Sequence, residues 1–311
     1  MSNYPVHVEI EHKVHLIRGA NRARFPEANA LLIDDEVLTL VDAGASRNHI
    51  VTTLRDLGHK PEDIDRIVLS HFHIDHKGHA AHFQEVSDCT VMSHPSADHG
   101  IKTLDGLIDF YGIKTHRFFN QWRYFIEARL PHVISDYRVD EHFEDGKPID
   151  CGEVELIPIH APGHSVDHTC FGINGYDTIL LIDIDLTKFG PWYGNKVSDI
   201  TQFKETMKKI IELEPKTGIS SHLLDPVTEN LRERLIDFES AFDQRDKRIL
   251  ELISKGHATI EKLGHVPAIY PRIPHEVFLT FEEIMLQKHV DILSEKGLVL
   301  VEDGRLQVQK A

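Results

Sequence analysis

The sequence predicts an α/β protein in which helices cover β-sheets. Short apolar runs typical of buried strands recur between residues 6 and 222, and turn residues separate them. Segments with helical periodicity lie between several of these runs, an alternation that indicates helices packed on sheets. With 41% hydrophobic and 27% charged residues among 311, the composition is that of a globular chain with a large core.

The N-terminal part begins with strands and then reaches a first helix. Residues 6–43 hold alternating and apolar runs that turn at Asp34 and Asp35, which predicts strands joined by tight turns. A helix is expected over about 48–57, where Gly58 ends it. Residues 64–70, "IDRIVLS", then predict a buried strand.

Residues 97–139 interrupt the succession of strand-like segments and are rich in Phe, Tyr, Trp and Arg. We expect a helical insertion here. Its aromatic surface either covers the functional site as a lid or packs the insertion onto the body. Strands are expected again within 148–164, 168–175 and 176–185, followed by a helix over 201–213 and a short strand at 217–222.

The C-terminal part has a different pattern, and we place a domain boundary at residue 240. Within 241–311, two helices are expected to end at Gly256 and Gly297, and a hairpin to turn at Asp303 and Gly304. This order predicts a small winged-helix-like domain behind a catalytic domain at 1–240. Residues 241–311 carry a net charge of −1, so nearly all of the chain's −16 lies before them. Nucleic-acid contact, packing and homodimer formation are all open as its role.

Composition narrows the classes of partner and location. No run approaches the roughly 18 apolar residues of a membrane helix, and the first residues lack the pattern of a signal peptide. Cys89, Cys151 and Cys170 are scattered and odd in number, which favours free thiols in the cytoplasm. The net charge of −16 disfavours a nucleic-acid partner without excluding a local basic groove.

Histidine is the compositional anomaly, at 23 residues, and five of them lie between Leu69 and His82. In "HFHIDH", His71 and His73 alternate directly after the predicted buried strand, and Asp75 and His76 follow one turn later. Polar groups at the end of a strand lie at the edge of a sheet, where functional sites are commonly built. This spacing predicts two metal ions side by side.

Three further segments end a strand with a potential ligand: "APGH", "LLIDID" and "SSH". Together with "HFHIDH" and with "VDAG" at 41–44, their order and spacing resemble the metallo-β-lactamase superfamily of metal-dependent hydrolases over roughly residues 6–225. The resemblance implies the αββα sandwich of that family. It also implies two divalent metal ions, for which we expect zinc, with iron or manganese as alternatives.

The resemblance assigns seven ligands to two metals. It implies one metal at His71, His73 and His164, a second at Asp75, His76 and His222, and Asp183 as the bridge between them. Asp42 resembles the family carboxylate that orients a ligand histidine through its other ring nitrogen. His160, His168, His79 and His82 are expected in supporting, packing or surface positions.

The sequence departs from the family pattern before the bridging aspartate, where Ile182 stands in place of the usual glycine. Asp185 follows two residues after Asp183, and in a strand both would face the same side. Asp183 is preferred because it aligns with the end of "TILLI", and Asp185 is the alternative.

The resemblance implies hydrolysis of an ester, thioester or lactone carbonyl by a hydroxide that bridges the two metals, with Asp75 guiding it or taking its proton. We expect a small-molecule acyl substrate and a pocket walled by four aromatic residues of the insertion and of "FGPWYG": Phe119, Trp122, Trp192 and Tyr193. The alternative is a metal-dependent nuclease or phosphodiesterase whose C-terminal domain contacts nucleic acid.

Overall fold

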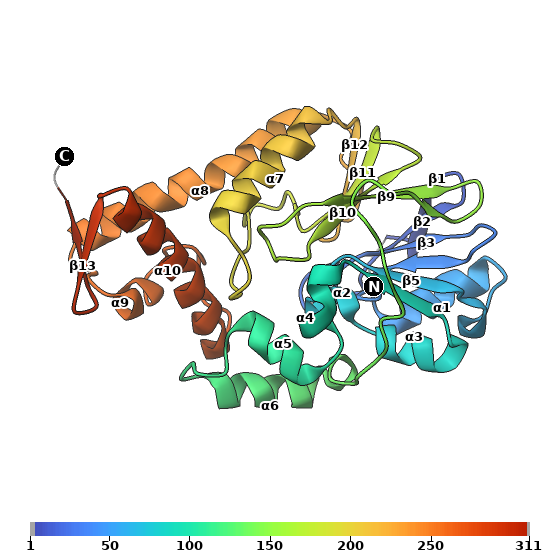
Figure 1. Ribbon diagram of the computed structural model, residues 1–311, viewed down its shortest axis with the longest axis horizontal. Coiled ribbons are helices and arrows are strands. Elements are labelled where there is room, and N and C mark those ends of the chain that lie inside the picture. Colours follow the sequence, from blue (N-terminus) through green and yellow to red (C-terminus); the bar gives the residue numbers. More distant parts are fainter. Residues whose placement is uncertain (1–3, 310–311) are drawn as a thin grey trace.

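The computed structural model describes residues 4–309, and two facing β-sheets form its centre (Figure 1). In this range the first sheet has seven strands in chain order: β1 (His7–Glu11), β2 (Val14–Ile17), β3 (Ala30–Ile33), β4 (Thr39–Val41), β5 (Arg66–Leu69), β6 (Thr90–Ser93) and β7 (Glu141–His142). Strands β1 to β4 are antiparallel, and β4 to β7 are parallel.

The second sheet has five strands within the described residues, in the order β12-β11-β10-β9-β8. Their bounds are β8 (Ile149–Asp150), β9 (Glu155–His160), β10 (Thr169–Ile173), β11 (Thr178–Ile182) and β12 (Thr217–Ser220). Strands β11 and β12 are parallel, whereas β10 is antiparallel to both β9 and β11. The C-terminal ends of β9, β11 and β12 therefore lie at the same edge of the sheet.

Apolar side chains from both sheets meet in a core between them, which includes Leu16, Leu31, Val41, Val68, Leu156, Phe171 and Leu180. The other face of each sheet is covered by helices. Helices α1 (Arg47–Asp56) and α3 (Ala80–Ser87) pack on the first sheet, and α7 (Ile200–Glu212) and α8 (Leu231–Ser254) pack on the second. The result is the expected order of helix, sheet, sheet and helix, which Figure 1 shows from bottom to top.

The expected helical insertion is present. It contains α4 (Asp98–Ile101), α5 (Leu104–Tyr111) and α6 (Phe119–Arg129), followed by a 3₁₀ turn at Pro131–Val133. Buried apolar residues of α5 and α6, among them Leu107 and Ile126, join the core under the first sheet. The insertion is thus packed onto the body.

The C-terminal elements are α9 (Ile260–Gly264), α10 (Leu279–Glu295) and a hairpin of β13 (Val299–Glu302) and β14 (Arg305–Val308). The hairpin turns at Asp303 and Gly304 as expected. The boundary predicted at residue 240 falls inside α8, which runs unbroken from 231 to 254. Apolar residues of α10 and the hairpin share one core with α7 and the second sheet, so no separate C-terminal core is seen in the described part. The winged-helix assignment stays a prediction.

Between residues 4 and 309, none of the helices has the length and the apolar character needed to cross a membrane.

Candidate metal centre

The seven predicted ligands all follow the C-terminal ends of strands at one edge of the sandwich. His71 and His73 come directly after β5, and Asp75 and His76 lie on the short helix α2 (Ile74–Lys77). From the second sheet, His164 follows β9, Asp183 follows β11 and His222 follows β12. The facing sheets therefore bring together residues that are up to 151 positions apart in the sequence.

The first group consists of His71, His73, His164 and Asp183, all buried, whose potential ligand atoms lie within 4.8 Å of one another. His71 Nε2 is 2.9 Å from His73 Nδ1, and His164 Nε2 is 2.8 Å from the same His73 nitrogen. Three ring nitrogens thus point to one place. Two neutral imidazoles can share one proton between facing nitrogens, but three converging nitrogens suit a common cation better.

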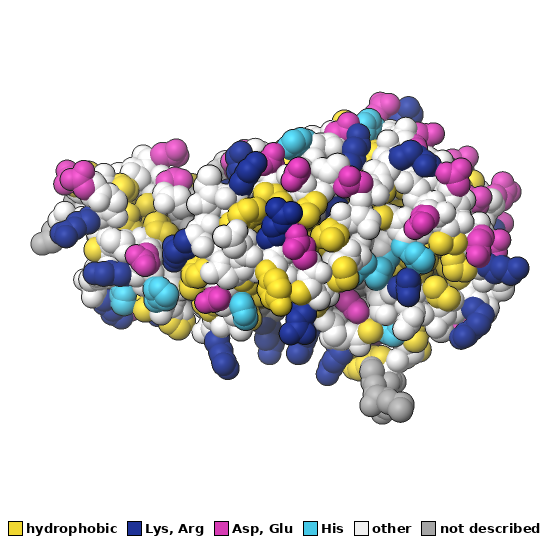
Figure 2. All heavy atoms as spheres, turned by 90° about the horizontal axis from the view of Figure 1, so that it is seen from below, with side chains coloured by type: hydrophobic (Ala, Val, Ile, Leu, Met, Phe, Trp, Pro, Cys, Tyr) yellow, Lys and Arg dark blue, Asp and Glu magenta, His cyan; other side chains and the backbone are white. Residues whose placement is uncertain are grey.

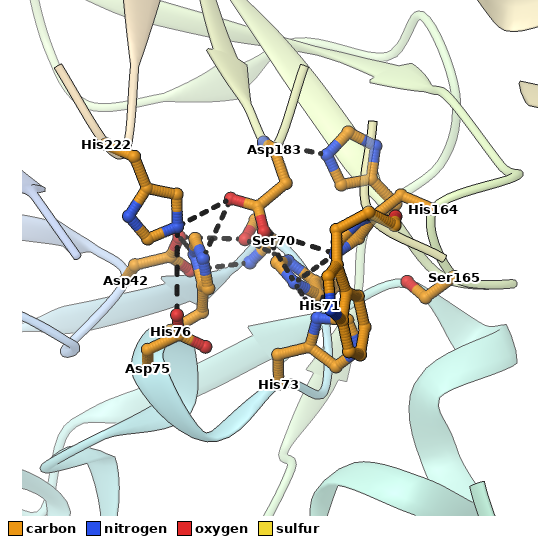
Figure 3. Close-up of polar contacts among 12 residues, drawn as sticks. Asp42, Ser70, His71, His73, Asp75, His76, His164, Ser165, Asp183 and His222 are labelled. Carbon is orange, nitrogen blue, oxygen red and sulfur yellow. Dashed lines mark hydrogen bonds and ion pairs between the residues drawn. The ribbon is translucent and has the colours of Figure 1, made fainter. Parts of the chain in front are cut away.

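The second group consists of Asp75, His76 and His222, again with ligand atoms within 4.8 Å. Asp183 lies between the two groups, as Figure 3 shows. Its Oδ2 is 3.2 Å from His164 Nε2, whereas its Oδ1 is 3.0 Å from His76 Nε2 and 3.4 Å from His222 Nε2. One carboxylate oxygen therefore faces each group, which is the arrangement expected of a bridge.

The outer ring nitrogens of four histidines are held by hydrogen bonds. The Nδ1 of His164 donates to the backbone oxygen of Trp192 (2.8 Å), and that of His222 donates to Ala23 O (2.7 Å). His71 Nδ1 lies 3.0 Å from Ser70 Oγ, and His76 Nδ1 lies 2.8 Å from Asp42 Oδ2. With a proton fixed on Nδ1, each of these rings presents the lone pair of Nε2 to the centre.

Asp42 lies beside His76, one of the predicted ligand histidines. It is buried and accepts three hydrogen bonds: from His76 Nδ1, from the Ser70 hydroxyl (2.7 Å) and from the Ser70 N–H (2.8 Å). The parallel pairing of β4 with β5, with Val41 opposite Val68, places Asp42 beside Ser70. Ser70 was not among the predicted site residues. Its hydroxyl lies between Asp42 Oδ2 and His71 Nδ1, so it also holds the His71 ring in place.

Asp183, and not Asp185, lies between the two groups, because strand β11 ends at Ile182. The backbone of Ile182 has φ +55°, a left-handed conformation that β-branched residues rarely adopt. The expectation that both aspartates share one face of a strand is therefore wrong. Asp185 belongs to neither group, and its Oδ1 accepts the Thr187 N–H (2.8 Å).

Two further buried residues support the centre: His168, for which a supporting, packing or surface position was expected, and Asn195, which was not predicted. His168 Nε2 accepts the backbone N–H of Asp183 (3.2 Å), while its Nδ1 donates to Ala161 O (2.9 Å). Burial lowers the pKa of His168 to about 3, so its ring is neutral. The amide of Asn195 lies 3.2 Å from His73 Nε2. No sequence pattern marks Asn195.

The donor set fits divalent cations by its chemistry and by its unpaired atoms. His76 Nε2 and Asp183 Oδ1 are buried and lie 3.0 Å apart, yet neither has a hydrogen bond of suitable geometry, although buried polar atoms are normally satisfied. Burial and neighbouring imidazoles lower the pKa values of His71 and His73, which keeps both rings neutral. Burial opposes protonation of His222 as well, but Asp183 and Asp75 outweigh it and raise its pKa to about 9. Without a cation, the second group therefore holds a proton where a metal would bind.

The four predicted pocket aromatics occupy different surroundings. The Trp192 ring lies against the centre, 5.1 Å from the His73 ring and 5.7 Å from the His164 ring. Phe119 is half-buried at the start of α6, and Trp122 is buried in the core 5.8 Å from Tyr111. Tyr193 is fully buried against Phe242 in the core under the second sheet, so its side chain forms no open wall.

A cavity of about 910 Å³ opens away from the centre, between α1, α3 and residues 132–138. Its lining includes Arg47, His79, His82 and His132, and none of the seven predicted ligands. His79 stacks on His132 with ring centroids 4.2 Å apart. His79 and His82 thus lie outside the centre, as expected.

Comparison with known proteins agrees with this geometry. The family model described as "Metallo-beta-lactamase superfamily" matches residues 24–222. The chain belongs to the metallo-β-lactamase superfamily. Family, relatives and the cluster of histidines and aspartates together make it a metal-dependent hydrolase.

Two solved structures share the fold over nearly the whole chain. A metallo-β-lactamase family protein from Thermus thermophilus is 20% identical, with a TM-score of 0.69 and 98% of each chain covered. A β-lactamase domain protein from Burkholderia ambifaria is 18% identical, with a TM-score of 0.74, 99% of this chain and 96% of that chain covered. Both matches extend over the C-terminal elements.

One curated relative is the atrochrysone carboxyl ACP thioesterase of Aspergillus fumigatus, which is 23% identical over 256 residues. The match covers 76% of this chain and 66% of that protein, slightly less than two thirds of its length.

Proposed function

We propose that the protein hydrolyses an ester, thioester or lactone of a small acyl compound at a two-metal centre. The observation that carries the proposal is Asp183, which directs one carboxylate oxygen to each of two ligand groups 3.0–3.4 Å away. We expect zinc as the metal. Iron and manganese are the alternatives, because imidazole and carboxylate ligands suit them as well. Two bound cations would activate a water molecule and polarise the carbonyl oxygen of the substrate.

The chain's own residues then hold and guide the reactants. Asp75 belongs to the second group, with its Oδ2 3.7 Å from His222 Nε2, and is the residue placed to accept or return a proton as the tetrahedral intermediate collapses. Asp42, Ser70 and His168 fix the orientation of ligand side chains and so preorganise the site. Buried surroundings keep the attacking and leaving groups in a low dielectric.

The substrate class is inferred from two supports. The curated relative is named for the hydrolysis of a thioester carried by ACP, which favours a thioester. The Trp192 ring beside the centre favours an apolar acyl group. A phosphodiester is the alternative, and the net charge of −16 disfavours it because a nucleic acid is held mainly through its phosphates. On the face shown in Figure 2, acidic and basic side chains are intermixed, and Lys and Arg side chains lie along its lower edge.

The test combines metal analysis with a substrate panel. Protein purified without added metal is reconstituted with zinc, iron or manganese, and its metal content and its turnover of thioesters, lactones and phosphodiesters are measured. We expect two metals per chain and turnover of an acyl substrate that Asp183→Asn abolishes. The exposed His99, outside both groups, provides the control variant His99→Ala. One metal or none per chain, or turnover of phosphodiesters alone, would overturn the proposal.

A further inference from the structure

The side chain of Trp192 is fixed against the centre from two sides. Its backbone oxygen accepts the hydrogen bond of His164 Nδ1, and its ring contacts the rings of His73 and His164. Tyr111, from the insertion, stacks on the other side of His73 with ring centroids 5.3 Å apart. The Trp192 ring is only partly buried, so an apolar group bound beside the first ligand group can contact it.

Residues from the C-terminal part hold this tryptophan. The Tyr270 hydroxyl accepts a hydrogen bond from Trp192 Nε1 at 2.8 Å. The Phe281 ring lies 5.5 Å from Trp192 and 5.7 Å from Tyr111. We call Tyr111, Trp192, Tyr270, Phe278 and Phe281 the aromatic wall. The rings of the wall are in continuous contact: the Phe278 ring centroid lies 5.9 Å from that of Phe281 and 6.2 Å from that of Tyr270.

The aromatic wall also reaches the second ligand group. Phe278 makes an edge contact of 6.0 Å with Phe25, which is 41% exposed. Phe25 belongs to the loop between β2 and β3, and Ala23 in the same loop accepts the hydrogen bond of His222 Nδ1. A chain of aromatic contacts therefore runs from His73 through the C-terminal part to the loop that orients His222.

Charged groups of α10 hold the wall in place. The buried Glu282 carboxylate accepts the N–H groups of Ile269 (2.9 Å) and Tyr270 (3.0 Å). The neighbouring Glu283 binds the Arg117 guanidinium, with Nη1 to Oε2 at 2.8 Å, and the His116 ring at 3.0 Å. These bonds fix the segment that carries Tyr270 and tie α10 to the insertion.

We infer that the C-terminal part forms the side of the substrate site that receives the apolar acyl group, with Phe278 and Tyr270 setting the length and width of the group accepted. The inference rests on the proposed acyl hydrolysis. Phe278 and Tyr270 are half-buried, so they can contact a ligand, whereas the buried Phe281 supports them from behind. This assigns residues 265–281 to substrate selection and accounts for the C-terminal part without nucleic acid.

The inference is tested with Phe278→Ala and the milder Tyr270→Phe, which removes only the hydroxyl that holds Trp192. Tyr124→Ala is the matched control, because Tyr124 is an aromatic residue of α6 that is 73% exposed and outside the wall. The kcat/KM values for short, medium and long straight-chain acyl thioesters of one thiol are compared. Metal content and melting temperature are measured for each variant.

For Phe278→Ala, we expect the ratio of kcat/KM for long over short acyl groups to change by roughly tenfold, the scale on which apolar contacts discriminate. Tyr270→Phe should shift this ratio in the same direction by less, and Tyr124→Ala should leave it unchanged. An equal loss for all acyl groups, or an unchanged ratio, would refute the inference.

Failure of the proposed function gives a different result. If the wild-type protein turns over no acyl substrate, the binding of a non-hydrolysable analogue is measured by calorimetry. The analogue is a long-chain alkyl thioether, in which a methylene group replaces the thioester carbonyl. Binding that Phe278→Ala weakens would then support the acyl site alone. Binding equal in the wild-type protein and Phe278→Ala, or no binding, would refute it.

Discussion

Replacing Asp42 by Asn should weaken the second metal position more than the first. Asp42 has φ +58°, a left-handed conformation that Asn tolerates as well as Asp, so the backbone is not strained by the change. The carboxylate accepts hydrogen bonds from the Ser70 N–H, the Ser70 hydroxyl and His76 Nδ1. The Ser70 N–H bonds to Oδ1 and His76 to Oδ2, and an amide has an oxygen at only one of these two positions, so it cannot accept from both donors.

If the amide oxygen stays with the Ser70 N–H, the NH₂ group faces His76 Nδ1. His76 must then carry its proton on Nε2, the nitrogen that faces Asp183 Oδ1 and would bind the metal. If the amide is turned over, two buried N–H donors face each other, at a cost of about 1–3 kcal/mol. Loss of such a supporting carboxylate typically lowers metal affinity about 10–100-fold, which corresponds to about 1.4–2.8 kcal/mol.

The assay is a zinc titration of metal-free protein in competition with a chromogenic chelator. The wild-type protein should bind two equivalents, and Asp42→Asn should weaken one step by at least about tenfold and the other by less, because Asp42 contacts His76 directly but reaches His71 only through Ser70. Asp167→Asn is the matched control, because Asp167 is buried nearby but accepts its hydrogen bond from Ser165 (2.7 Å) and not from a ligand histidine. Equal affinities of both steps in Asp42→Asn and the wild-type protein would refute the reasoning.

Three further predictions concern stability and anchoring. Burial raises the pKa of Asp167 to about 6, so the folded state keeps a proton that the unfolded state loses above about pH 4. The free energy of unfolding should therefore fall by about 3 kcal/mol as pH rises from 4 to 6 through this group, and urea titrations of Asp167→Asn should lack that decrease. At Ile182, with φ +55°, the glycine variant should melt at or above the alanine variant, the reverse of the usual order. Glu283→Ala should cost about 1–3 kcal/mol and speed hydrogen exchange around Arg117, because Arg117 and His116 lose their partner.

Each of these has its own contrary outcome. A pH dependence unchanged in Asp167→Asn would mean that the carboxyl titrates alike in both states. An Ile182→Gly variant that melts well below Ile182→Ala would show that the left-handed backbone carries no strain there. For Glu283, the control is the exposed i,i+4 pair of Glu127 with Arg123, whose loss should have little effect on stability because solvent screens the pair. Equal effects of Glu283→Ala and Glu127→Ala would argue against an anchoring role.

The order of elements and the centre's residues could be predicted because both depend on local patterns. Strand runs end in polar residues at 71–76, 164, 183 and 222, and the sheets need only bring those ends to one edge. The helical insertion could be predicted because no strand-like pattern is present there, and the hairpin could be predicted from the turn residues Asp303 and Gly304.

The remaining features depend on long-range packing that no local pattern shows. Asp185 could be set aside only once the left-handed backbone of Ile182 was known, since a regular strand would place it beside Asp183. Tyr193 stands next to Trp192 in an aromatic stretch, yet its ring is fully buried in the core under the second sheet, whereas the partly buried Trp192 ring also contacts His73. The contact of Phe278 with Phe25 joins residues 253 positions apart.

Helix α8 has a mechanical consequence for how substrate reaches the centre. It is a rod of 24 residues, about 36 Å long, with neither Gly nor Pro between Leu231 and Ser254. Its first half packs on the second sheet, and its second half packs against α10 and the hairpin. Since the helix has no residue at which it would bend, no hinge separates these two halves. The C-terminal side of the site is consequently held rigidly to the second sheet, so we expect an opening movement to involve the loop between β2 and β3, where Phe25 contacts Phe278.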